Sequence, residues 1–161
     1  MRALNAGQII RLLRKIPSTK NIFKGVATRD LKYRVPKKNH KKPQAFIQNT
    51  GYIKRGVHWI LIFFSEESSL VFDSFGRAPK VLFLESSVIQ PYKPITYNPY
   101  KLQSPKSLVC GHYCIFFLYY LSQQKKIEQI NRLFSENRLD NDKLVFKFVQ
   151  ALAKKWGVSM K

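Results

Sequence analysis

The fold prediction begins with the stretch KLQSPKSLVCGHYCIFFLYYLS, residues 101–122. A turn-forming segment, 104–107, gives way at Cys110 to a strongly apolar run, which predicts a buried helix over 110–124. The first N–H groups of a helix have no intrahelical partner, so they stabilise a nearby thiolate. Cys110 is therefore a candidate nucleophile. The alternative is a small buried apolar residue, which is the usual state of a free cysteine.

Two neighbours of Cys110 have properties that nucleophilic catalysis needs. Gly111 has no side chain, so we expect a substrate to be able to approach the backbone there. Gln103 lies seven positions upstream of Cys110, and its amide is a candidate oxyanion donor.

The length of 161 residues predicts a single domain with a substantial core. We divide residues 1–161 into a basic N-terminal helix and loop (1–43), a core (44–122) and C-terminal helices (123–161). The two cysteines lie four residues apart, which neither closes a disulfide readily nor provides a zinc-binding spacing. We therefore expect a reducing compartment and no metal or small-molecule cofactor. No apolar run is long enough to predict a membrane span or a secretory signal.

The charge of the chain is strongly and unevenly positive. The whole sequence carries +20, of which residues 1–55 supply +14 and residues 56–161 supply +6. A field of this strength attracts polyanions, so the sequence predicts nucleic acid as a partner. An anionic membrane is a weaker alternative, because the basic cluster lacks an amphipathic anchor. The candidate contacts to DNA are the lysines of that cluster: Lys37, Lys38, Lys41 and Lys42.

Hydrophobic periodicity predicts an α+β order of elements. Residues 4–15 form an amphipathic helix capped by Asn5, and 18–43 are irregular. A short strand at 45–48 and a turn at 49–51 follow. Residues 57–64 are apolar throughout and predict a central strand covered on both faces, paired through a turn at 65–68 with a strand at 69–73.

The second half of the chain is expected to be mainly helical. Residues 80–84 fit either a strand or a helix, and 91–103, which contain several prolines, fit an edge strand. Two amphipathic helices are expected at 125–134 and 140–156. The apolar side of the second is assigned to Leu144, Phe148, Leu152 and Trp156.

A histidine and an aspartate flank the predicted hairpin. His58 lies in the most apolar strand, and Asp73 ends its partner. Alone, His58 is more simply a core histidine and Asp73 a turn residue. Pairing of the two strands, however, places the carboxylate beside the imidazole, where it can fix the tautomer and stabilise the charged ring.

These residues resemble the adenovirus protease (adenain) family and, more distantly, the SUMO-specific cysteine proteases. The resemblance covers about residues 44–122 and rests on four fragments in order. They are Asn49-Thr50-Gly51 with Gly56-Val57-His58-Trp59, Phe72-Asp73-Ser74-Phe75-Gly76, Gln103, and Cys110-Gly111-His112-Tyr113-Cys114. The resemblance implies an adenain/SUMO-protease-like cysteine protease fold. In this fold a central mixed sheet packs on a buried helix that carries the nucleophile.

The resemblance also implies roles for individual residues. Cys110 becomes the nucleophile, His58 its base and Asp73 the group that orients the base. Gln103 and the Cys110 N–H form the oxyanion hole. Trp59 is expected either to pack against the catalytic pair or to be an ordinary core aromatic, whereas His112 and Cys114 are expected to be helix residues without a catalytic role.

The function implied by the resemblance is cleavage of viral capsid or core precursors during virion maturation, at sites with glycine near the scissile bond. Double-stranded DNA is the expected stimulating polyanion, and an activating peptide would not join through the adenoviral disulfide, because the only cysteines are Cys110 and Cys114. We expect the protein to be a monomer that does not associate with a membrane. Its expected locations are the virion and the host nucleus or a cytoplasmic virus factory. Two alternatives remain: a protease of ubiquitin-like modifiers, and an inactive, basic nucleic-acid-binding protein.

Overall fold

The computed structural model describes residues 1–27, 41–51, 58–66, 68–82 and 94–160. Its elements in chain order are α1 (Ala6–Lys15), β1 (Phe23–Ala27), β2 (Gln44–Asn49), β3 (Trp59–Phe64), β4 (Ser69–Phe72), the 3-10 helix η1 (Pro79–Leu82), β5 (Ile95–Tyr97), α3 (Cys110–Leu121), α4 (Ile127–Asn131) and α5 (Arg138–Lys155). The described strands form one mixed sheet in the order β1-β2-β3-β4-β5. The pairs β1–β2 and β4–β5 are parallel, and the two central pairs are antiparallel. The predicted α+β class is confirmed.

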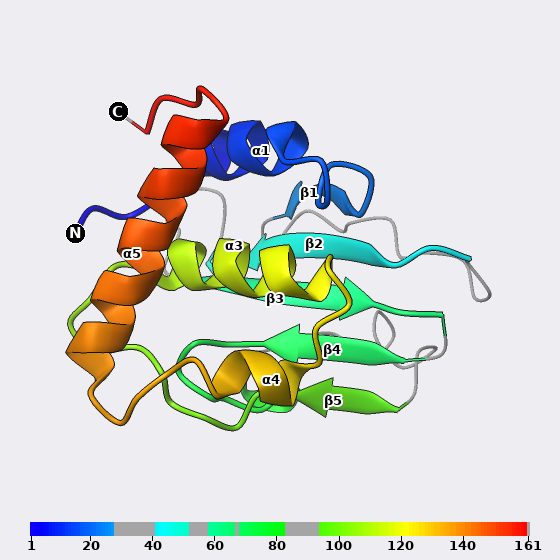
Figure 1. Ribbon diagram of the computed structural model, residues 1–161. Coiled ribbons are helices and arrows are strands. Elements are labelled where there is room, and N and C mark those ends of the chain that lie inside the picture. The colour runs from blue at the N-terminus through cyan, green and yellow to red at the C-terminus, as the bar shows by residue number, and fades with distance from the viewer. Residues whose placement is uncertain (28–40, 52–57, 67, 83–93, 161) are drawn as a thin grey trace.

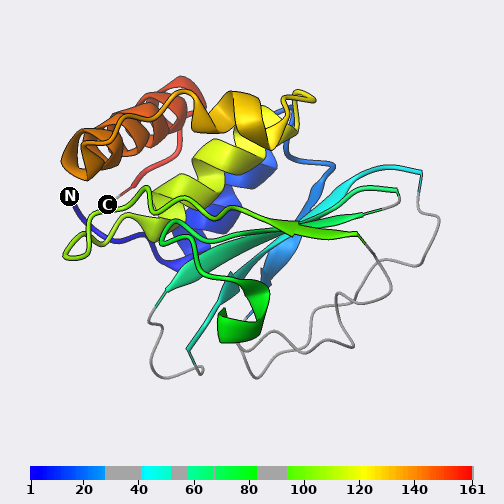
Figure 2. The ribbon, with the colours of Figure 1, turned by 90° about the horizontal axis from the view of Figure 1, so that it is seen from below.

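Strand β3 is the centre of the sheet and is buried on both faces. Leu61 belongs to the larger apolar cluster, whereas Ile60, Ile62 and Phe64 belong to a second cluster on the opposite face. Helices α1, α3, α4 and α5 lie on one side of the sheet and η1 lies on the other (Figure 2). The prediction of a central strand covered on both faces is therefore confirmed, because a run without polar alternation has no side to present to water.

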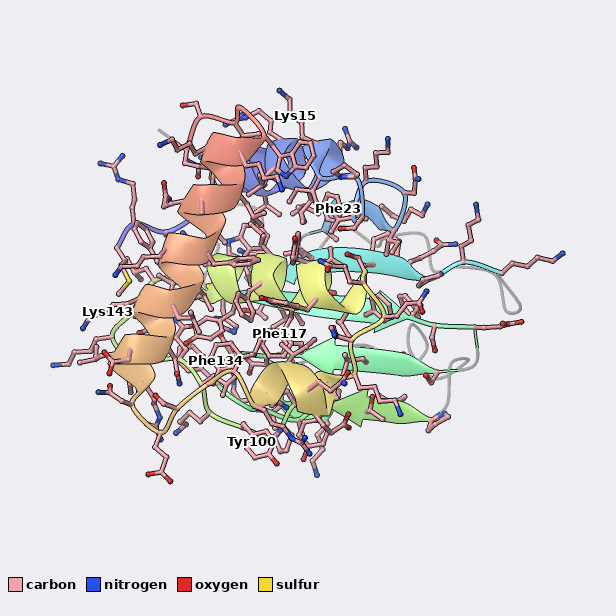
Figure 3. All side chains as sticks on the ribbon, in the orientation of Figure 1. Lys15, Phe23, Tyr100, Phe117, Phe134 and Lys143 are labelled. Carbon is pink, nitrogen blue, oxygen red and sulfur yellow. The ribbon has the colours of Figure 1, made fainter. Side chains whose placement is uncertain are left out.

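Helix α3 lies over the middle of the sheet, beside β3 (Figure 1). Every residue from Cys110 to Leu118 is buried, which explains why the run is apolar on all sides. Phe117 stacks on Phe72 of β4 with ring centroids 3.7 Å apart, and its other stacked neighbour is Phe134, at 5.8 Å. Figure 3 labels both residues, Phe117 on α3 and Phe134 in the segment that joins α4 to α5. The predicted buried helix is confirmed.

Helix α1 begins and ends where its sequence signals place it. Asn5 is the N-cap and forms a capping box with Gln8, and the helix ends just before Ile16 and Pro17. Its buried side, which includes Leu12 and Leu13, joins the larger cluster.

Helix α5 buries a side that only partly matches the predicted one: Leu152 is buried, and Phe148 and Trp156 are half-buried against the larger cluster. Leu144 is 40% exposed, and the buried apolar positions are Val145, Val149, Leu152 and Ala153. The predicted row advances by four residues at each step, and each such step rotates around the helix by about 40°. The observed row mixes steps of four and three, so it stays on one side of the helix.

Three other predicted segments differ from the structure. The segment 18–43 was expected to be irregular but contains β1. Gly25 interrupts the strand pattern in the sequence, and the pairing of β1 with β2 is irregular at the same place. Helix α4 is shorter than the predicted 125–134. Within 94–103, the described part of the predicted 91–103, only β5 is a strand, at the edge of the sheet. In the described part of the chain, none of the helices combines the length and apolarity that crossing a membrane requires.

Candidate active site

Three elements meet at one end of the central strands of the sheet. Strand β3 begins where β4 ends, because the two are antiparallel and Leu61 pairs with Phe72. The first turn of α3 lies at this same end of the strands (Figure 1). His58 immediately precedes β3, and Asp73 immediately follows β4. Their side chains are buried, with His58 Nε2 only 2.6 Å from Asp73 Oδ1.

Cys110 is the first residue of α3 and lies at the same end of the strands, close to the start of β3. Its Sγ accepts a hydrogen bond from the backbone N–H of Trp59 at 3.4 Å, and its side chain also interacts with the His58 ring. It retains 9% of its accessible surface. The thiol, the imidazole and the carboxylate, which come from three separate stretches, are therefore brought together in this order.

The neighbours of His58 favour the charged form of its ring. Burial by itself lowers the pKa of His58, but hydrogen bonds to Asp73 and Cys110 outweigh this and raise the pKa above its ordinary value of 6.5. Burial by itself raises the pKa of Asp73. Hydrogen bonds from His58 and Arg77 nevertheless lower the pKa of Asp73 to about 2. Both shifts favour the charged forms, an imidazolium beside a carboxylate.

The Asp73 carboxylate is held by a turn that the sequence analysis did not recognise. Oδ2 accepts from Arg77 Nε at 2.6 Å and from the Arg77 backbone N–H at 3.2 Å, while Oδ1 also accepts from the Phe75 N–H at 3.1 Å. Gly76 makes the turn possible, because its φ is +71° and an added Cβ would lie 2.6 Å from the Pro99 carbonyl oxygen. The available sequence signal is the turn-forming pair of Asp73 and Gly76 in Asp73-Ser74-Phe75-Gly76.

Phe75 covers one face of the His58 imidazole. Its ring stacks on His58 with centroids 5.0 Å apart and an interplanar angle of 29°. The Arg77 guanidinium carbon lies 5.4 Å from the centroid of the Phe75 ring. Phe75 was part of the fragment that carried the resemblance, but no role had been assigned to it. The stack limits rotation of the imidazole and shields its contact with Asp73 from water.

Gln103 is buried close to the same end of the strands. Both the oxygen and the nitrogen of its side-chain amide are hydrogen-bonded. Oε1 accepts from Ser74 Oγ at 2.6 Å, and Nε2 donates to the Ser107 carbonyl oxygen at 2.7 Å and contacts Ser107 Oγ at 3.1 Å. The Gln103 backbone N–H also donates to the carbonyl of Ser74, the residue after Asp73. Gln103 is thus joined to the segment that carries the carboxylate.

Gly111 does not provide open space for a substrate, contrary to the sequence-based expectation. It is buried, and an added Cβ would lie 3.2 Å from Trp59 Cδ1, 3.3 Å from Leu4 Cβ and 3.4 Å from Ile9 Cδ1. The glycine instead allows α3 to approach α1 and the Trp59 ring closely. Trp59 donates from Nε1 to the Leu4 carbonyl at 3.0 Å, so its ring and its backbone N–H link the N-terminal segment to Cys110.

The remaining residues singled out in the sequence lie elsewhere. His112 and Cys114 are buried in α3; burial lowers the pKa of His112 to about 4 and raises that of Cys114. Lys41 and Lys42 are exposed, and Lys37 and Lys38 fall outside the described residues.

No protein-family model and no curated protein matches this sequence. Solved structures do match the fold. One is the ASFV pS273R protease, with a TM-score of 0.60 and 16% identity over 93% of this chain and 67% of that one. Another is ChlaDub1 from Chlamydia trachomatis, with a TM-score of 0.61 and 13% identity over 96% of this chain and 93% of that one. At this identity the likeness concerns the fold, so the chain has the α+β fold of the SUMO-protease-like cysteine proteases.

Proposed function

We propose that this protein is a cysteine endopeptidase. The observation that carries the proposal is the position of the His58 ring, which interacts with Cys110 and lies 2.6 Å from the Asp73 carboxylate. A nucleophile, a base and a group that orients the base are the parts that covalent acyl transfer requires. The likeness in fold to the ASFV pS273R protease supports this assignment, and in this chain Cys110 is the first residue of α3.

Each residue has a defined part in the proposed reaction. The Cys110 thiolate attacks the peptide carbonyl carbon, so that a C–S bond forms and the carbonyl π pair moves to oxygen. When the intermediate collapses, the C–N bond breaks and the amine takes its proton from the His58 imidazolium. A water molecule that gives a proton to His58 then attacks the thioester, which releases the acid and restores the thiolate.

Two donors are suited to the negatively charged oxygen of the intermediate. The Cys110 backbone N–H is at the first position of α3 and lacks an intrahelical acceptor there. The Gln103 amide is the second, and it lies next to the segment of Asp73 and Ser74. In a site of low dielectric, fixed donors of this kind stabilise developing charge without reorganisation.

For the substrate, we propose viral capsid or core precursors cut during virion maturation, at sites with glycine near the scissile bond. The adenain-like fragments and the fold shared with the ASFV pS273R protease support this choice. The corresponding locations are the virion and the host nucleus or a cytoplasmic virus factory.

The direct test is hydrolysis of a peptide library by the purified full chain, read by mass spectrometry. We expect cleavage next to glycine by the wild type and none by Cys110→Ala. Absence of cleavage by the wild type, with and without double-stranded DNA, would refute the endopeptidase assignment.

The second candidate function is cleavage of ubiquitin-like conjugates. It is favoured by the fold likeness to ChlaDub1, which extends over 96% of this chain and 93% of that one. Ubiquitin and SUMO carrying a C-terminal vinyl methyl ester distinguish the two candidates. Covalent capture of either probe at Cys110 favours this second function, whereas cleavage of unmodified peptides without probe capture favours the first.

DNA is proposed as a stimulating partner because of the charge. The net charge of +20 is concentrated in the N-terminal third, and Arg11, Arg14 and Lys15 are exposed on α1. Figure 3 shows Lys15 and Lys143 pointing outward from α1 and α5. We expect a monomer that binds duplex DNA with an affinity that falls steeply with salt, and no metal, membrane or disulfide-linked activating peptide. A salt-independent affinity would contradict this. A basic DNA-binding protein without activity would bind DNA but leave peptides intact.

A further inference from the structure

The Gln103 amide is held by a turn, and the last helix holds that turn. Gln103 Nε2 donates to the Ser107 carbonyl oxygen at 2.7 Å and contacts Ser107 Oγ at 3.1 Å. The Ser107 backbone N–H donates back to the Ser104 carbonyl at 3.1 Å, which closes the turn 104–107. The direction of the Gln103 amide therefore depends on where this turn lies.

Asp142 of α5 binds both ends of the turn. Its two carboxylate oxygens lie 3.4 and 3.3 Å from the Ser104 backbone nitrogen, which donates to them, and the Ser107 side chain also interacts with this carboxylate. Asp142 is fully buried, although it lies 38 residues from Ser104 in the sequence. A buried carboxylate is costly unless hydrogen bonds compensate it, so this position is specified by its donors and not by packing.

The same carboxylate also reaches the nucleophile helix. Tyr113 Oη contacts both Asp142 Oδ1 and the Leu102 carbonyl oxygen at 3.0 Å. Tyr113 lies three residues after Cys110 on α3, and Leu102 immediately precedes Gln103. Asp142 is thus the point at which α5, the turn and the helix of Cys110 are joined by hydrogen bonds.

We propose that Asp142 is a positioning residue of the oxyanion site, which fixes the Ser104–Ser107 turn and through Ser107 aims the amide of Gln103. The inference rests on the proposed function and adds a residue from outside the segment 44–122 to the catalytic arrangement. Asp142 acts through Gln103 and does not touch the reacting atoms. Its effect is therefore confined to the step in which the oxyanion forms.

The test compares peptide hydrolysis with alkylation of Cys110 by iodoacetamide in the full chain. Alkylation uses the thiolate but creates no oxyanion, so it reports on Cys110 and His58 alone. For Asp142→Asn we expect kcat to fall about 10- to 100-fold, with KM and the alkylation rate changed less than about threefold. Gln103→Ala should show the same pattern with a larger loss, about 100- to 1000-fold in kcat.

The double variant Gln103→Ala/Asp142→Asn identifies the route of the effect. If Asp142 acts through Gln103, adding Asp142→Asn to Gln103→Ala lowers kcat by less than about threefold. The matched control is Asp140→Asn, since Asp140 is on the same helix but exposed and paired with Lys143 at 3.2 Å. This control should retain wild-type kcat.

Several outcomes would overturn the proposal. An equal loss of hydrolysis and alkylation in Asp142→Asn would indicate general disruption, and full multiplication of the two effects would indicate an independent role. If Asp142→Asn fails to fold, Tyr113→Phe and Ser107→Ala each remove one contact of the carboxylate and should show the same split between kcat and alkylation at smaller amplitude. A wild type that alkylates rapidly but hydrolyses no peptide would refute the proposed function itself, and this inference with it.

Discussion

The two cysteines of α3 lie one turn apart on the same apolar helix, yet they have different surroundings. Cys110 keeps 9% of its surface and receives the Trp59 N–H, with His58 and Asp73 beyond it. Cys114 is completely buried, and burial raises the pKa of its thiol. The difference teaches that the reactivity of a cysteine depends on what the neighbouring strands bring to it more than on its helix.

The largest expected effect separates the two cysteines by substitution. Cys110→Ala should lower kcat/KM about 10,000-fold or more, because it removes the nucleophile. Cys114→Ala should change kcat/KM less than about threefold, since it only trims a buried side chain. Hydrolysis of a library-derived fluorogenic peptide measures both. Comparable losses in the two variants would contradict the distinction.

Removing the carboxylate beyond His58 should make Cys110 more like an ordinary thiol. Asp73→Asn should lower kcat about 1000-fold, because the amide neither stabilises the imidazolium nor fixes the ring orientation as the carboxylate does. Arg77→Ala, which leaves the carboxylate in place, should cause a smaller loss and serves as the comparison. Single-turnover kinetics at neutral pH measure the acylation step directly, and an unchanged rate in Asp73→Asn would exclude Asp73 from the mechanism.

Chemical labelling should sharpen the contrast between the two thiols. At neutral pH, iodoacetamide should modify Cys110 at least about 100-fold faster than Cys114, because Cys110 retains some accessible surface beside His58 whereas Cys114 is completely buried. Peptide mapping of the native protein after short exposures gives the two rates. Urea-unfolded protein is the control, in which the rates should converge. Equal labelling in the native state would contradict the geometry.

The His58–Asp73 pair predicts a pH dependence of stability. The raised pKa of His58 means that its contribution is fully present below pH 6.5 and is lost as the pH rises through the folded-state value. The lowered pKa of Asp73 means that its contribution is present above its ordinary value of 3.8 and is lost as the pH falls towards about 2. Urea midpoints of the wild type and Asp73→Asn should therefore differ most between these limits. A difference independent of pH would argue against the ion pair.

The smallest expected effect concerns the close packing behind Cys110. Gly111→Ala places a methyl group 3.2 to 3.4 Å from Trp59, Leu4 and Ile9, so the neighbours must move slightly. We expect a loss of about 1 kcal/mol and a fall in Tm of about 2–4 °C, since the better helix propensity of alanine offsets part of the strain. Lys147→Ala, exposed on α5, is the control for thermal unfolding. A stabilised Gly111→Ala would show that the approach of α3 to α1 is looser than described.

Much of the frame was predictable from local sequence, because the responsible signals are local. The apolar run after Cys110 indicates a buried helix, Asn5 and Pro17 bound α1, and the unbroken apolar strand β3 must be central. The hairpin between β3 and β4 then brings His58 and Asp73 together, since antiparallel pairing places the start of one strand beside the end of the other.

The sequence did not indicate contacts that depend on side-chain direction or on distant segments. The buried side of α5 was only partly predicted, because a four-residue row drifts around the helix and includes the exposed Leu144, and Gly111 proved to face α1 and Trp59. The links from Arg77 to Asp73 and from Asp142 to Ser104 depend on a left-handed turn at Gly76 and on the docking of the last helix.

The sequence by itself determined which residues could carry the chemistry and which elements hold them, because charge, apolar periodicity and capping act over a few residues. Only the tertiary structure decided that the Trp59 N–H points at the Cys110 sulfur, that Phe75 covers the His58 ring and that Asp142 braces the turn behind Gln103. These contacts join atoms that lie far apart along the chain. Their geometry is therefore fixed by packing of the whole domain, which no local pattern encodes.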